Sequence, residues 1–412
     1  MDNLKNKKII GIINSLHRGG AERKMVYLLH NEIVSDLFIL ENKIEYEIRE
    51  DKIKSIKPLF LNNKIKHPLL KYFIIPFYSF KISRQIERGS TVVSFIERAD
   101  ITNVFSKIFR NHKIITSVLI NPKKAYKGLR SPLLLILKIS YIFSDKIIVN
   151  SKGGAKLLRS FAFLKNKVHT VYNPIEVDFV RQKSVETLSK IEEKIFKNYP
   201  AFINVSRLVG AKGQWHLIKI FKKIKESIPE AKLVIVGDGK LRDYLIKLSR
   251  ELGMKTYSKF ENDDLNEYYD IYFFGSQENP FKYISNSSVF ISTSLYEGFS
   301  NIILEALACG VPIVSSDCRF GPREILAPDT DFDYETKVSE YSSFGIMMPM
   351  LDDKIKVNIN SFSNIEILWS QTIVDLYKNE KIRDEYSEKS VKRARDFDIK
   401  IIGSEWVKSL ND

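Results

Sequence analysis

The sequence predicts an α/β fold with two doubly wound parallel sheets, one in each of two domains. Short apolar runs alternate with longer amphipathic segments along almost the whole chain, which favours strand–helix units over a β-sandwich or a helical bundle. The chain has 412 residues, enough for two hydrophobic cores. A polar, helix-patterned stretch bounded by prolines, from Asn173 to Pro200, indicates where one domain ends and the next begins.

Strands are expected where aliphatic and β-branched residues form short runs between turn-forming residues. These runs cover residues 8–14, 91–95, 113–118, 146–150 and 167–171 in the first domain, and 201–205, 232–236, 271–274, 289–293 and 312–315 in the second. Helical spacing with interspersed aromatic residues continues from residue 364 to the C-terminus. We therefore expect a first domain over residues 1–180, a second over residues 181–385, and a C-terminal helix over residues 386–412 that packs back toward the first domain.

Composition excludes several classes of protein. Hydrophobic residues at 44% and charged residues at 28% are typical of a globular chain and exclude a disordered one. Cys309 and Cys318 are too few for a disulfide framework. The N-terminus lacks the pattern of a signal peptide, and the longest apolar run, residues 132–143, is too short to span a bilayer and is interrupted by Lys138. We expect a cytoplasmic protein without a transmembrane helix.

Positive charge is concentrated in the first half of the chain. Residues 1–180 carry 32 basic and 15 acidic side chains, whereas residues 181–412 carry 33 and 35. Within residues 51–170, the basic residues are interleaved with aromatic and aliphatic ones. Such a surface attracts an anionic membrane or an anionic acceptor, and it would attract nucleic acid as well. A third interpretation is that these lysines are simply solvated.

The segment from residue 296 to residue 312 predicts an anion site. It follows a strand, and Ser300 or Asn301 is a natural N-cap for an apolar helix that Gly310 ends. The N–H groups of the first turn and the positive end of the helix dipole would then face the preceding loop. A phosphate is the group that this arrangement favours.

Two carboxylates, Glu297 and Glu305, flank the predicted phosphate site. One could accept hydrogen bonds from sugar hydroxyls and the other from a ribose diol. The alternative interpretation is that Glu297 is a turn residue and Glu305 an exposed helix residue, because two carboxylates eight positions apart often occur by chance.

Arg207 and Lys212 form a second candidate constellation. They lie on a glycine-containing loop directly after the first strand of the second domain, at the edge where α/β sheets bind ligands. A guanidinium and an ammonium five residues apart can converge on a diphosphate and neutralise the charge that grows on a departing nucleotide. Two solvated surface cations are the alternative.

Glycines follow strands at two further places. Gly19 and Gly20 separate the first strand from an amphipathic helix, and glycine there allows the backbone to approach a phosphate or a sugar closely. Gly237 occupies the corresponding position after the second strand of the second domain, where a plain tight turn is an equally good interpretation.

Taken in order, these motifs resemble the retaining nucleotide-sugar glycosyltransferases of glycosyltransferase family 4, which have the two-domain GT-B fold. Glu297 and Glu305 match the Glu-x7-Glu motif of the family, Arg207 and Lys212 match its diphosphate-binding pair, and residues 19–23 match its N-terminal glycine loop. The segments 275–280 and 317–326 resemble the subgroup that elongates lipid-linked glycans or builds surface polysaccharides.

The resemblance implies two Rossmann-like domains that face each other across a cleft, with the donor bound mainly by the second domain and the acceptor by the first. It implies a UDP-sugar donor, no obligatory metal or other cofactor, and a glycan acceptor linked to polyprenyl diphosphate. The catalytic residues would be Arg207 and Lys212 at the β-phosphate and Glu297 at the sugar hydroxyls. The residues expected to bind the donor are Gly19, Gly20, Gly237, Gln277, Asn279, Phe299, Ser300, Asn301 and Glu305.

The acceptor side of the first domain departs from the family pattern. The segment 117–122 lacks the polar residue that often precedes Asn-Pro in the family. Glu97 and Arg98 could line the acceptor site instead, and His17 is a further candidate. We expect Lys123, Lys124 and Lys127 to contact an anionic membrane at the inner face of the cell membrane.

Two other functions fit parts of the sequence. A GT-B epimerase or phosphorylase would share the fold but would need its own catalytic groups, which the sequence does not offer. A nucleic-acid-binding protein would explain the pI of about 9.4, but it requires a basic recognition helix or aromatic stacking platforms. We therefore expect no nucleic-acid partner.

Overall fold

The computed structural model describes residues 8–17, 19–59, 70–118, 139–261, 263–355, 359 and 361–411. The chain divides into two compact units. Unit 1 comprises Met1–Pro174 and Phe397–Asp412, and unit 2 comprises Ile175–Asp396. The sequence predicts boundaries after residues 180 and 385, whereas the two units of the structure divide after residues 174 and 396.

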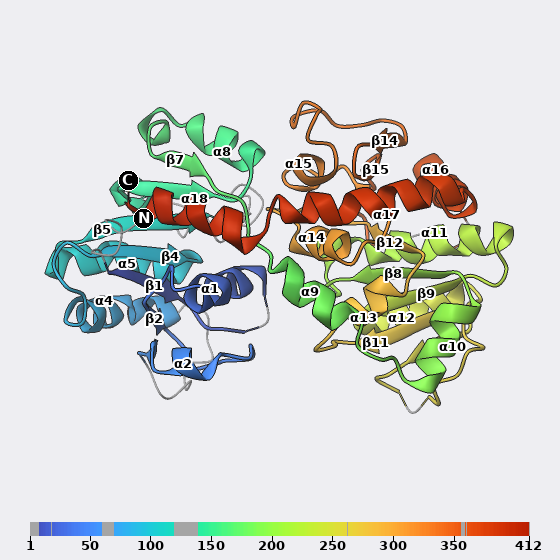
Figure 1. The fold of residues 1–412 in the computed structure, drawn as a ribbon, viewed down its shortest axis with the longest axis horizontal. Helices are drawn as coiled ribbons and strands as arrows, with labels where there is room; N and C mark the ends of the chain where they lie inside the picture. The colour runs from blue at the N-terminus through green and yellow to red at the C-terminus, as the bar shows by residue number, and fades with distance from the viewer. Residues whose placement is uncertain are drawn as a thin grey trace. The chain divides into compact units, whose positions relative to one another are not determined.

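The described residues of unit 1 form a seven-stranded parallel sheet in the order β3-β2-β1-β4-β5-β6-β7 (Figure 1). The all-buried sequence of β1, Ile-Ile-Gly-Ile-Ile, is typical of a strand covered on both faces. The strands are β1 (Ile9–Ile13), β2 (Asp36–Ile39), β3 (Ile56–Pro58), β4 (Thr91–Phe95), β5 (Lys113–Val118), β6 (Lys146–Val149) and β7 (Val168–Thr170). The helices are α1 (Gly20–His30), α2 (Glu50–Ile53), α3 (Leu70–Phe73), α4 (Ile75–Ser83), α5 (Glu97–Phe109), α8 (Lys152–Arg159), the 3-10 helix η3 (Ala162–Leu164) and α18 (Ile399–Asn411).

The C-terminal helix α18 belongs to unit 1, although unit 2 precedes it in the sequence. Its Trp406 is fully buried and stacks on Phe95 of β4, with 5.9 Å between the ring centroids. The Nζ atom of Lys24 in α1 lies 4.5 Å from the centre of the Trp406 ring and donates a hydrogen bond to Ser117. Burial lowers the pKa of Lys24 well below its usual value.

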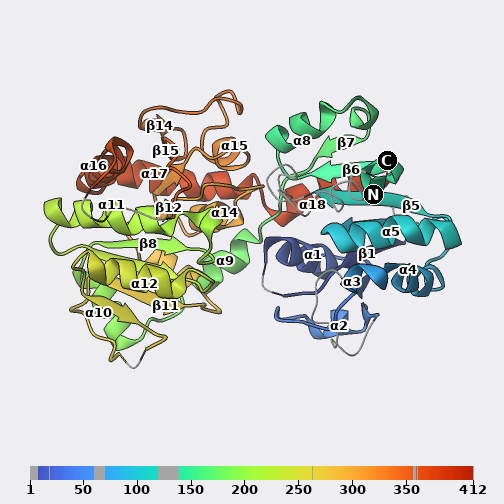
Figure 2. The ribbon, with the colours of Figure 1, turned by 180° about the vertical axis from the view of Figure 1, so that it is seen from behind.

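The described residues of unit 2 form an eight-stranded sheet in the order β10-β11-β9-β8-β12-β13-β15-β14, in which only the β14–β15 pair is antiparallel (Figure 2). The strands are β8 (Ala201–Val205), β9 (Lys232–Val236), β10 (Thr256–Ser258), β11 (Ile271–Gly275), β12 (Val289–Ser292), β13 (Ile313–Ser316), β14 (Glu340–Ser342) and β15 (Gly345–Met348). The helices are α9 (Val177–Ser184), α10 (Lys190–Asn198), the 3-10 helix η4 (Gly210–Lys212), α11 (Gln214–Ser227), α12 (Arg242–Glu251), α13 (Phe281–Ser285), α14 (Asn301–Ala308), α15 (Pro322–Leu326), α16 (Asn364–Lys378) and α17 (Glu380–Arg395).

A buried polar cluster joins α11 to α16 on one side of the unit 2 core. Glu366 accepts hydrogen bonds from His216 Nδ1 and Lys219 Nζ, each at 2.8 Å. The same carboxylate completes a capping box with Ser363 at the start of α16. Burial alone would raise the pKa of Glu366, but the hydrogen bonds from His216 and Lys219 lower it to about 2.

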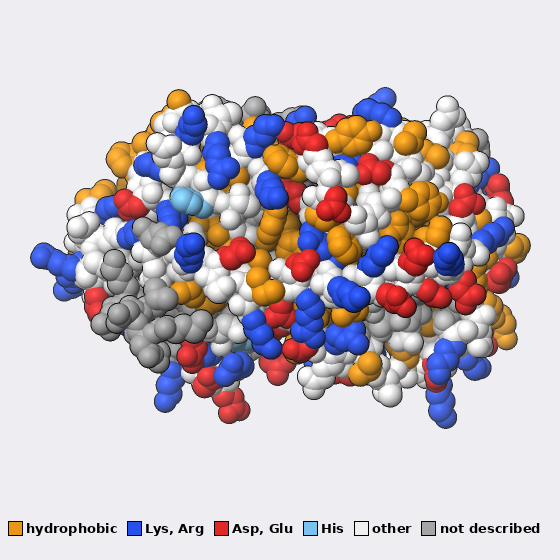
Figure 3. Space-filling model, turned by 45° about the horizontal axis from the view of Figure 1, so that its top comes forward, with side chains coloured by type: hydrophobic (Ala, Val, Ile, Leu, Met, Phe, Trp, Pro, Cys, Tyr) orange, Lys and Arg blue, Asp and Glu red, His pale blue; other side chains and the backbone are white. Residues whose placement is uncertain are grey.

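The predicted α/β class is confirmed, and every predicted strand overlaps an observed one. In the described ranges, none of the helices is both long and apolar enough to cross a bilayer. Figure 3 shows one face of the molecule, on which acidic and basic side chains are intermingled with hydrophobic ones.

Candidate active site

The site in unit 2 lies at the point where the strand order of its sheet reverses. Strand β8 pairs with β9 on one side and with β12 on the other. The strands that follow β8 in the sequence, β9 to β11, extend the sheet on one side of β8, and strands β12 to β15 extend it on the other side. The loops after β8 and β12 therefore diverge at the carboxyl edge of the sheet, which is where open α/β sheets bind their ligands.

The loop after β8 is held by close backbone packing. A Cβ atom on Gly237, whose φ is +140°, would lie 2.0 Å from the carbonyl oxygen of Ser206, so this position requires glycine. The backbone N–H of Leu208 donates to the carbonyl of Asp238 at 3.0 Å. The side chain of Gln214 donates to Ser206 Oγ and to the carbonyl of Arg207, at 2.8 and 2.9 Å. These contacts fix the backbone at Arg207.

Arg207 itself points its charge into solvent. Its side chain is exposed, and its guanidinium has no hydrogen bond or ion pair with any residue that the structure describes. A guanidinium on a rigid backbone keeps all its donors available for an anion, and it binds phosphate oxygens in bidentate fashion.

Lys212 and Glu297 meet at the same edge. The Nζ atom of Lys212 lies 2.5 Å from Oε1 of Glu297, and both side chains are largely buried. Backbone contacts hold the two loops together: Thr293 Oγ1 donates to the carbonyl of Lys212 at 2.9 Å, and the N–H of Leu295 donates to the carbonyl of Ala211 at 2.8 Å. A cation and a carboxylate 85 residues apart in sequence are therefore fixed side by side.

Ser300 joins this pair at the start of α14. It occupies the N-cap position, as the sequence predicts, and Gly310 ends the helix with a φ of +74°. The Ser300 hydroxyl makes no cap hydrogen bond and instead lies 3.5 Å from Oε1 of Glu297. The hydroxyl donates toward the carboxylate, at the limit of hydrogen-bond distance.

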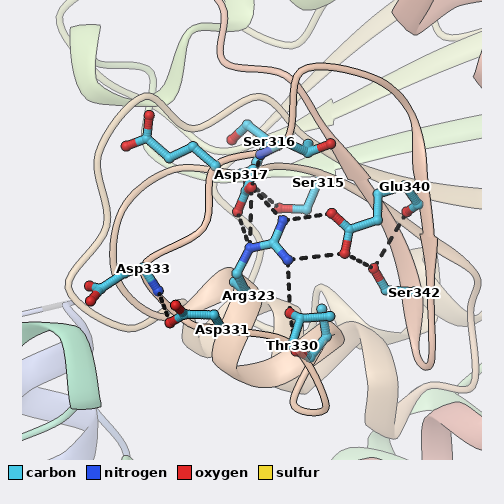
Figure 4. A network of polar contacts seen from close by, with 12 residues as sticks. Ser315, Ser316, Asp317, Arg323, Thr330, Asp331, Asp333, Glu340 and Ser342 are labelled. Carbon is cyan, nitrogen blue, oxygen red and sulfur yellow. Dashed lines mark hydrogen bonds and ion pairs between the residues drawn. The ribbon is translucent and has the colours of Figure 1, made fainter.

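A buried arginine network joins α15 to β14 and to the end of β13 (Figure 4). The Arg323 guanidinium binds Asp317 and Glu340, with its Nη2 atom 2.6 and 2.8 Å from their carboxylate oxygens, and it also donates to Thr330. Burial opposes this charge, but the hydrogen bonds that Arg323 donates to Glu340 and Asp317 raise its pKa, so it stays charged.

Gly321, two residues before Arg323, packs closely against the start of α14. It has a φ of +94°, and a Cβ atom there would lie 2.8 Å from Cα of Phe299. The Gly321 backbone therefore lies directly against the turn that leads into α14.

The other predicted donor residues of unit 2 have different surroundings. Glu305 is buried in the second turn of α14. Gln277 donates to the carbonyl of Phe274 at 2.6 Å, and Asn279 donates to the carbonyl of Lys183 at 2.7 Å and to Glu186 at 2.8 Å. The amide groups of Gln277 and Asn279 therefore hold the loop after β11, and Asn279 also anchors the end of α9.

The unit 1 candidates gather at the switch point of their own sheet, between β1 and β4. Gly19 is the N-cap of α1, and its N–H and C=O both bond the hydroxyl of Tyr46, at 3.1 and 2.8 Å. Gly20 begins α1. His17 is exposed, with its Nδ1 atom 2.5 Å from Glu45.

Glu97 and Arg98 begin α5, directly after β4. Arg98 forms an ion pair with Glu41. The preceding residue, Ile96, has a φ of +74°, a strained backbone conformation for a β-branched residue, of the kind that clusters at functional sites. Lys123, Lys124 and Lys127 lie outside the described residues.

Several residues that shape these sites are absent from the sequence-based candidates. Gln214 and Arg323 in unit 2 and Lys24 and Tyr46 in unit 1 make the contacts described above. Of these, only Arg323 lies in one of the motifs recognised from the sequence, the segment 317–326. In the part of the chain that the structure describes, no three His, Cys, Asp or Glu side chains are grouped so that they could hold a metal ion.

Each unit is an α/β unit whose sheet is wholly or almost wholly parallel, and the second sheet carries a cation–carboxylate pair at its switch point. This combination defines an enzyme of the GT-B class. Residues 185–332 match the family model of the group 1 glycosyl transferases. An uncharacterized glycosyltransferase of Methanocaldococcus jannaschii is 35% identical over 375 residues, which cover 87% of this chain and 88% of that protein. The chain belongs to the group 1 glycosyl transferases and is a glycosyltransferase.

Two further comparisons describe its relatives. An N-acetylgalactosaminyltransferase of Campylobacter jejuni, whose named acceptor is a diphospho-undecaprenol-linked saccharide, is 28% identical over 377 residues, covering 86% of this chain and 95% of that protein. The crystal structure of Anabaena HepE in complex with UDP and glucose superposes with a TM-score of 0.72 at 15% identity, covering 98% of this chain and all of that one. The likeness to HepE shows the shared GT-B fold.

Proposed function

We propose that the protein is a retaining glycosyltransferase that moves a hexose or an N-acetylhexosamine from a UDP-sugar to a lipid-linked or polysaccharide acceptor. The observation that carries the proposal is the Lys212–Glu297 pair at the switch point of the unit 2 sheet, with Ser300 and the start of α14 beside it. This edge offers both a cation for a phosphate and a carboxylate for sugar hydroxyls. The UDP held by Anabaena HepE supports the choice of donor.

The proposed chemistry assigns a role to each of these groups. Arg207 and Lys212 neutralise the charge that grows on the diphosphate as it leaves, and Glu297 accepts hydrogen bonds from the sugar. The acceptor oxygen bonds to the anomeric carbon on the face from which the diphosphate departs, and a phosphate oxygen takes the hydroxyl proton. Positioning of the two substrates supplies much of the rate. Glu305 would bind the ribose diol and Phe299 to Asn301 the β-phosphate.

We assign the acceptor to unit 1, where His17, Glu97 and Arg98 lie at the carboxyl edge of the sheet. Two Campylobacter jejuni relatives named as transferases to undecaprenyl-diphosphate-linked saccharides support a polyprenyl-linked glycan as the acceptor. Such an acceptor is embedded in a membrane, so we propose that the protein acts as a peripheral enzyme at the cytosolic face.

Release of UDP from a panel of UDP-sugars, measured with and without a polyprenyl-diphosphate-linked glycan, tests the proposal. Arg207→Ala and Lys212→Ala should each lower kcat/KM by roughly 100-fold or more, the usual loss when a group that stabilises transition-state charge is removed. The matched control is Lys247→Ala, which removes an exposed lysine of α12 and should leave the rate unchanged.

Two results would contradict the proposal separately. Failure to bind or turn over any nucleotide sugar would reject the donor assignment. Inversion at the anomeric carbon of the product, read from its NMR coupling constants, would reject the retaining mechanism and leave the donor site standing.

A further inference from the structure

The outer surface of α3, α4 and α5 in unit 1 is unusually apolar. Helices α4 and α5 lie side by side in both ribbon views (Figures 1 and 2), and α3 ends two residues before α4 begins. Six of their large apolar side chains are 39% to 81% exposed, more than the scattered exposure that is normal on a protein surface. This set, which we call the aromatic surface, consists of Phe73, Phe77, Phe80, Phe105, Ile108 and Phe109.

The inward faces of the two longer helices carry polar residues beside apolar ones such as Ile75, Tyr78 and Ile82 of α4. In α4 the small polar residues Ser79 and Ser83 face inward, where Ser79 Oγ donates to the carbonyl of Thr102 at 3.0 Å. In α5 the inward face likewise carries Asn103 and Ser106, which are buried. A helix on a soluble surface normally turns its apolar stripe toward the core and its polar stripe outward.

The exposed rings form one continuous surface. Phe80 of α4 packs edge-to-face on Phe109 of α5, with 5.5 Å between the ring centroids. In α3 and α4 the exposed phenylalanines recur at positions 73, 77 and 80, and in α5 the exposed apolar residues are at 105, 108 and 109. The positions within α4 and within α5 have helical spacing, so each of these two helices contributes a stripe, and α3 contributes Phe73.

The two segments that carry this surface are basic. Residues 70–86 and 101–113 contain no Asp or Glu, whereas Glu87 follows the first segment and Glu97 and Asp100 lie in the first turn of α5. Arg84 is exposed, with its guanidinium carbon 5.5 Å from the Phe80 ring centre. Two of the lysines are paired with acidic residues of other elements, Lys71 with Glu41 and Lys107 with Asp145. The cations of the two segments are Lys71, Lys81, Arg84, Lys107, Arg110 and Lys113.

We propose that the aromatic surface docks the protein on a phospholipid bilayer that carries anionic lipids. Exposed rings insert at the boundary between headgroups and acyl chains, and neighbouring cations are attracted to the anionic headgroups. The cationic fringe fits this occupant better than a second copy of the chain, because two copies would bring like charges together. The purpose of the docking rests on the proposed function, since a polyprenyl-linked acceptor is reached only at a membrane.

Co-sedimentation with phosphatidylcholine vesicles, with and without phosphatidylglycerol, tests the proposal. The wild type should bind the anionic vesicles and bind pure phosphatidylcholine vesicles more weakly. The combined variant Phe77→Ser, Phe80→Ser and Ile108→Ser should bind the anionic vesicles at least tenfold more weakly, a change of about 1.4 kcal/mol. The matched control, Tyr268→Ser with Val338→Ser, removes comparably exposed apolar side chains from unit 2 and should bind like the wild type.

Separate measurements guard against an unfolded variant and against other occupants. Urea unfolding and UDP affinity should be unchanged in every variant, and Arg84→Glu alone should weaken binding to the anionic vesicles. Vesicle binding that is unaffected by these changes would overturn the proposal. So would a wild type that forms dimers in light scattering, loses them in the triple variant and binds no vesicles.

The outcomes also separate this inference from the proposed function. If UDP-sugar turnover is found but the aromatic surface does not affect vesicle binding, only the docking surface is rejected. If the surface binds vesicles as expected but no nucleotide sugar binds, only the proposed function is rejected.

Discussion

Replacing Gly321 by alanine should damage the donor site through the backbone alone. Gly321 has a φ of +94°, and the new Cβ atom would lie 2.8 Å from Phe299 Cα and 3.3 Å from the backbone nitrogen of Ser300. Both neighbours are backbone atoms that cannot rotate away as a side chain would. Arg323, two residues further along the chain, is held by its own ion pairs. The turn that holds Phe299 and Ser300 must therefore shift.

The magnitude follows from two contributions. A left-handed backbone costs a non-glycine residue about 1 to 2 kcal/mol, and crowding a well-packed site typically costs about 1 to 3 kcal/mol. The free energy of unfolding should therefore fall by about 2 to 5 kcal/mol. Because the displaced turn leads into α14, UDP affinity should fall as well, by roughly ten- to a hundredfold, since small misplacements of binding groups are costly.

Urea unfolding and calorimetric titration with UDP measure the two effects. The matched control is Gly253→Ala: Gly253 also has a positive φ, +77°, but its Cβ position has no atom within 4 Å. This control should lose only the strain contribution, about 1 to 2 kcal/mol, and keep its UDP affinity. If Gly321→Ala binds UDP as tightly as Gly253→Ala does, the turn before α14 does not hold the nucleotide, and the reasoning is wrong.

Two predictions concern buried ionisable groups. Because the Glu366 pKa is lowered to about 2, its pairing should stabilise the fold by about 3 kcal/mol above pH 4.5, and this contribution should disappear as the pH falls from 4.5 toward 2. The difference in free energy of unfolding between the wild type and Glu366→Gln, measured with urea, should therefore shrink over that range. A constant difference would refute the assignment. Burial lowers the pKa of Lys24, so the unfolded chain binds the proton more tightly and Lys24 costs stability increasingly as the pH falls below 10.5. Lys24→Met should therefore unfold at higher urea concentrations than the wild type at pH 7, and the difference between the two midpoints should narrow toward pH 10. A variant that is less stable than the wild type at pH 7 would show that the contacts of Lys24 with the aromatic rings outweigh the cost of its desolvation.

The sequence is most informative where local chemistry determines structure. The central strands are recognisable because continuous apolar runs such as residues 289–292 can be buried only inside a parallel sheet. Strands β2, β3, β10, β14 and β15 escape prediction. They lie at or next to the edges of their sheets, and β3, β10 and β14 lack an apolar run, with the sequences Ile-Lys-Pro, Thr-Tyr-Ser and Glu-Tyr-Ser. The end of α14 at Gly310 is likewise local, since the helix needs a residue that tolerates a left-handed backbone there.

The candidate site is less predictable where it depends on distant partners. The spacing of Arg207 and Lys212 marks the loop after β8, but it does not reveal that Lys212 pairs with Glu297, 85 residues away. Asp317 and Arg323 lie close in sequence, yet their network depends on Glu340, which only the register of the sheet edge brings near. From composition alone, Lys24 would be taken for a solvated surface charge, whereas its side chain is fully buried in the structure.

The charged residues of the two units are arranged differently, and this difference supports our proposal that unit 2 binds the donor and unit 1 contacts the acceptor and the membrane. In unit 2 the charges at the core of the site are paired at fixed positions, as are Lys212 with Glu297 and Arg323 with Asp317. Arg207 stands apart because its guanidinium remains available to an anion, on a backbone that Gly237 and Gln214 make rigid. Such a group is suited to a small, well-defined diphosphate. The excess cations of the first half include those spread around exposed rings, an arrangement that suits a broad anionic surface, because no single geometry is required of it.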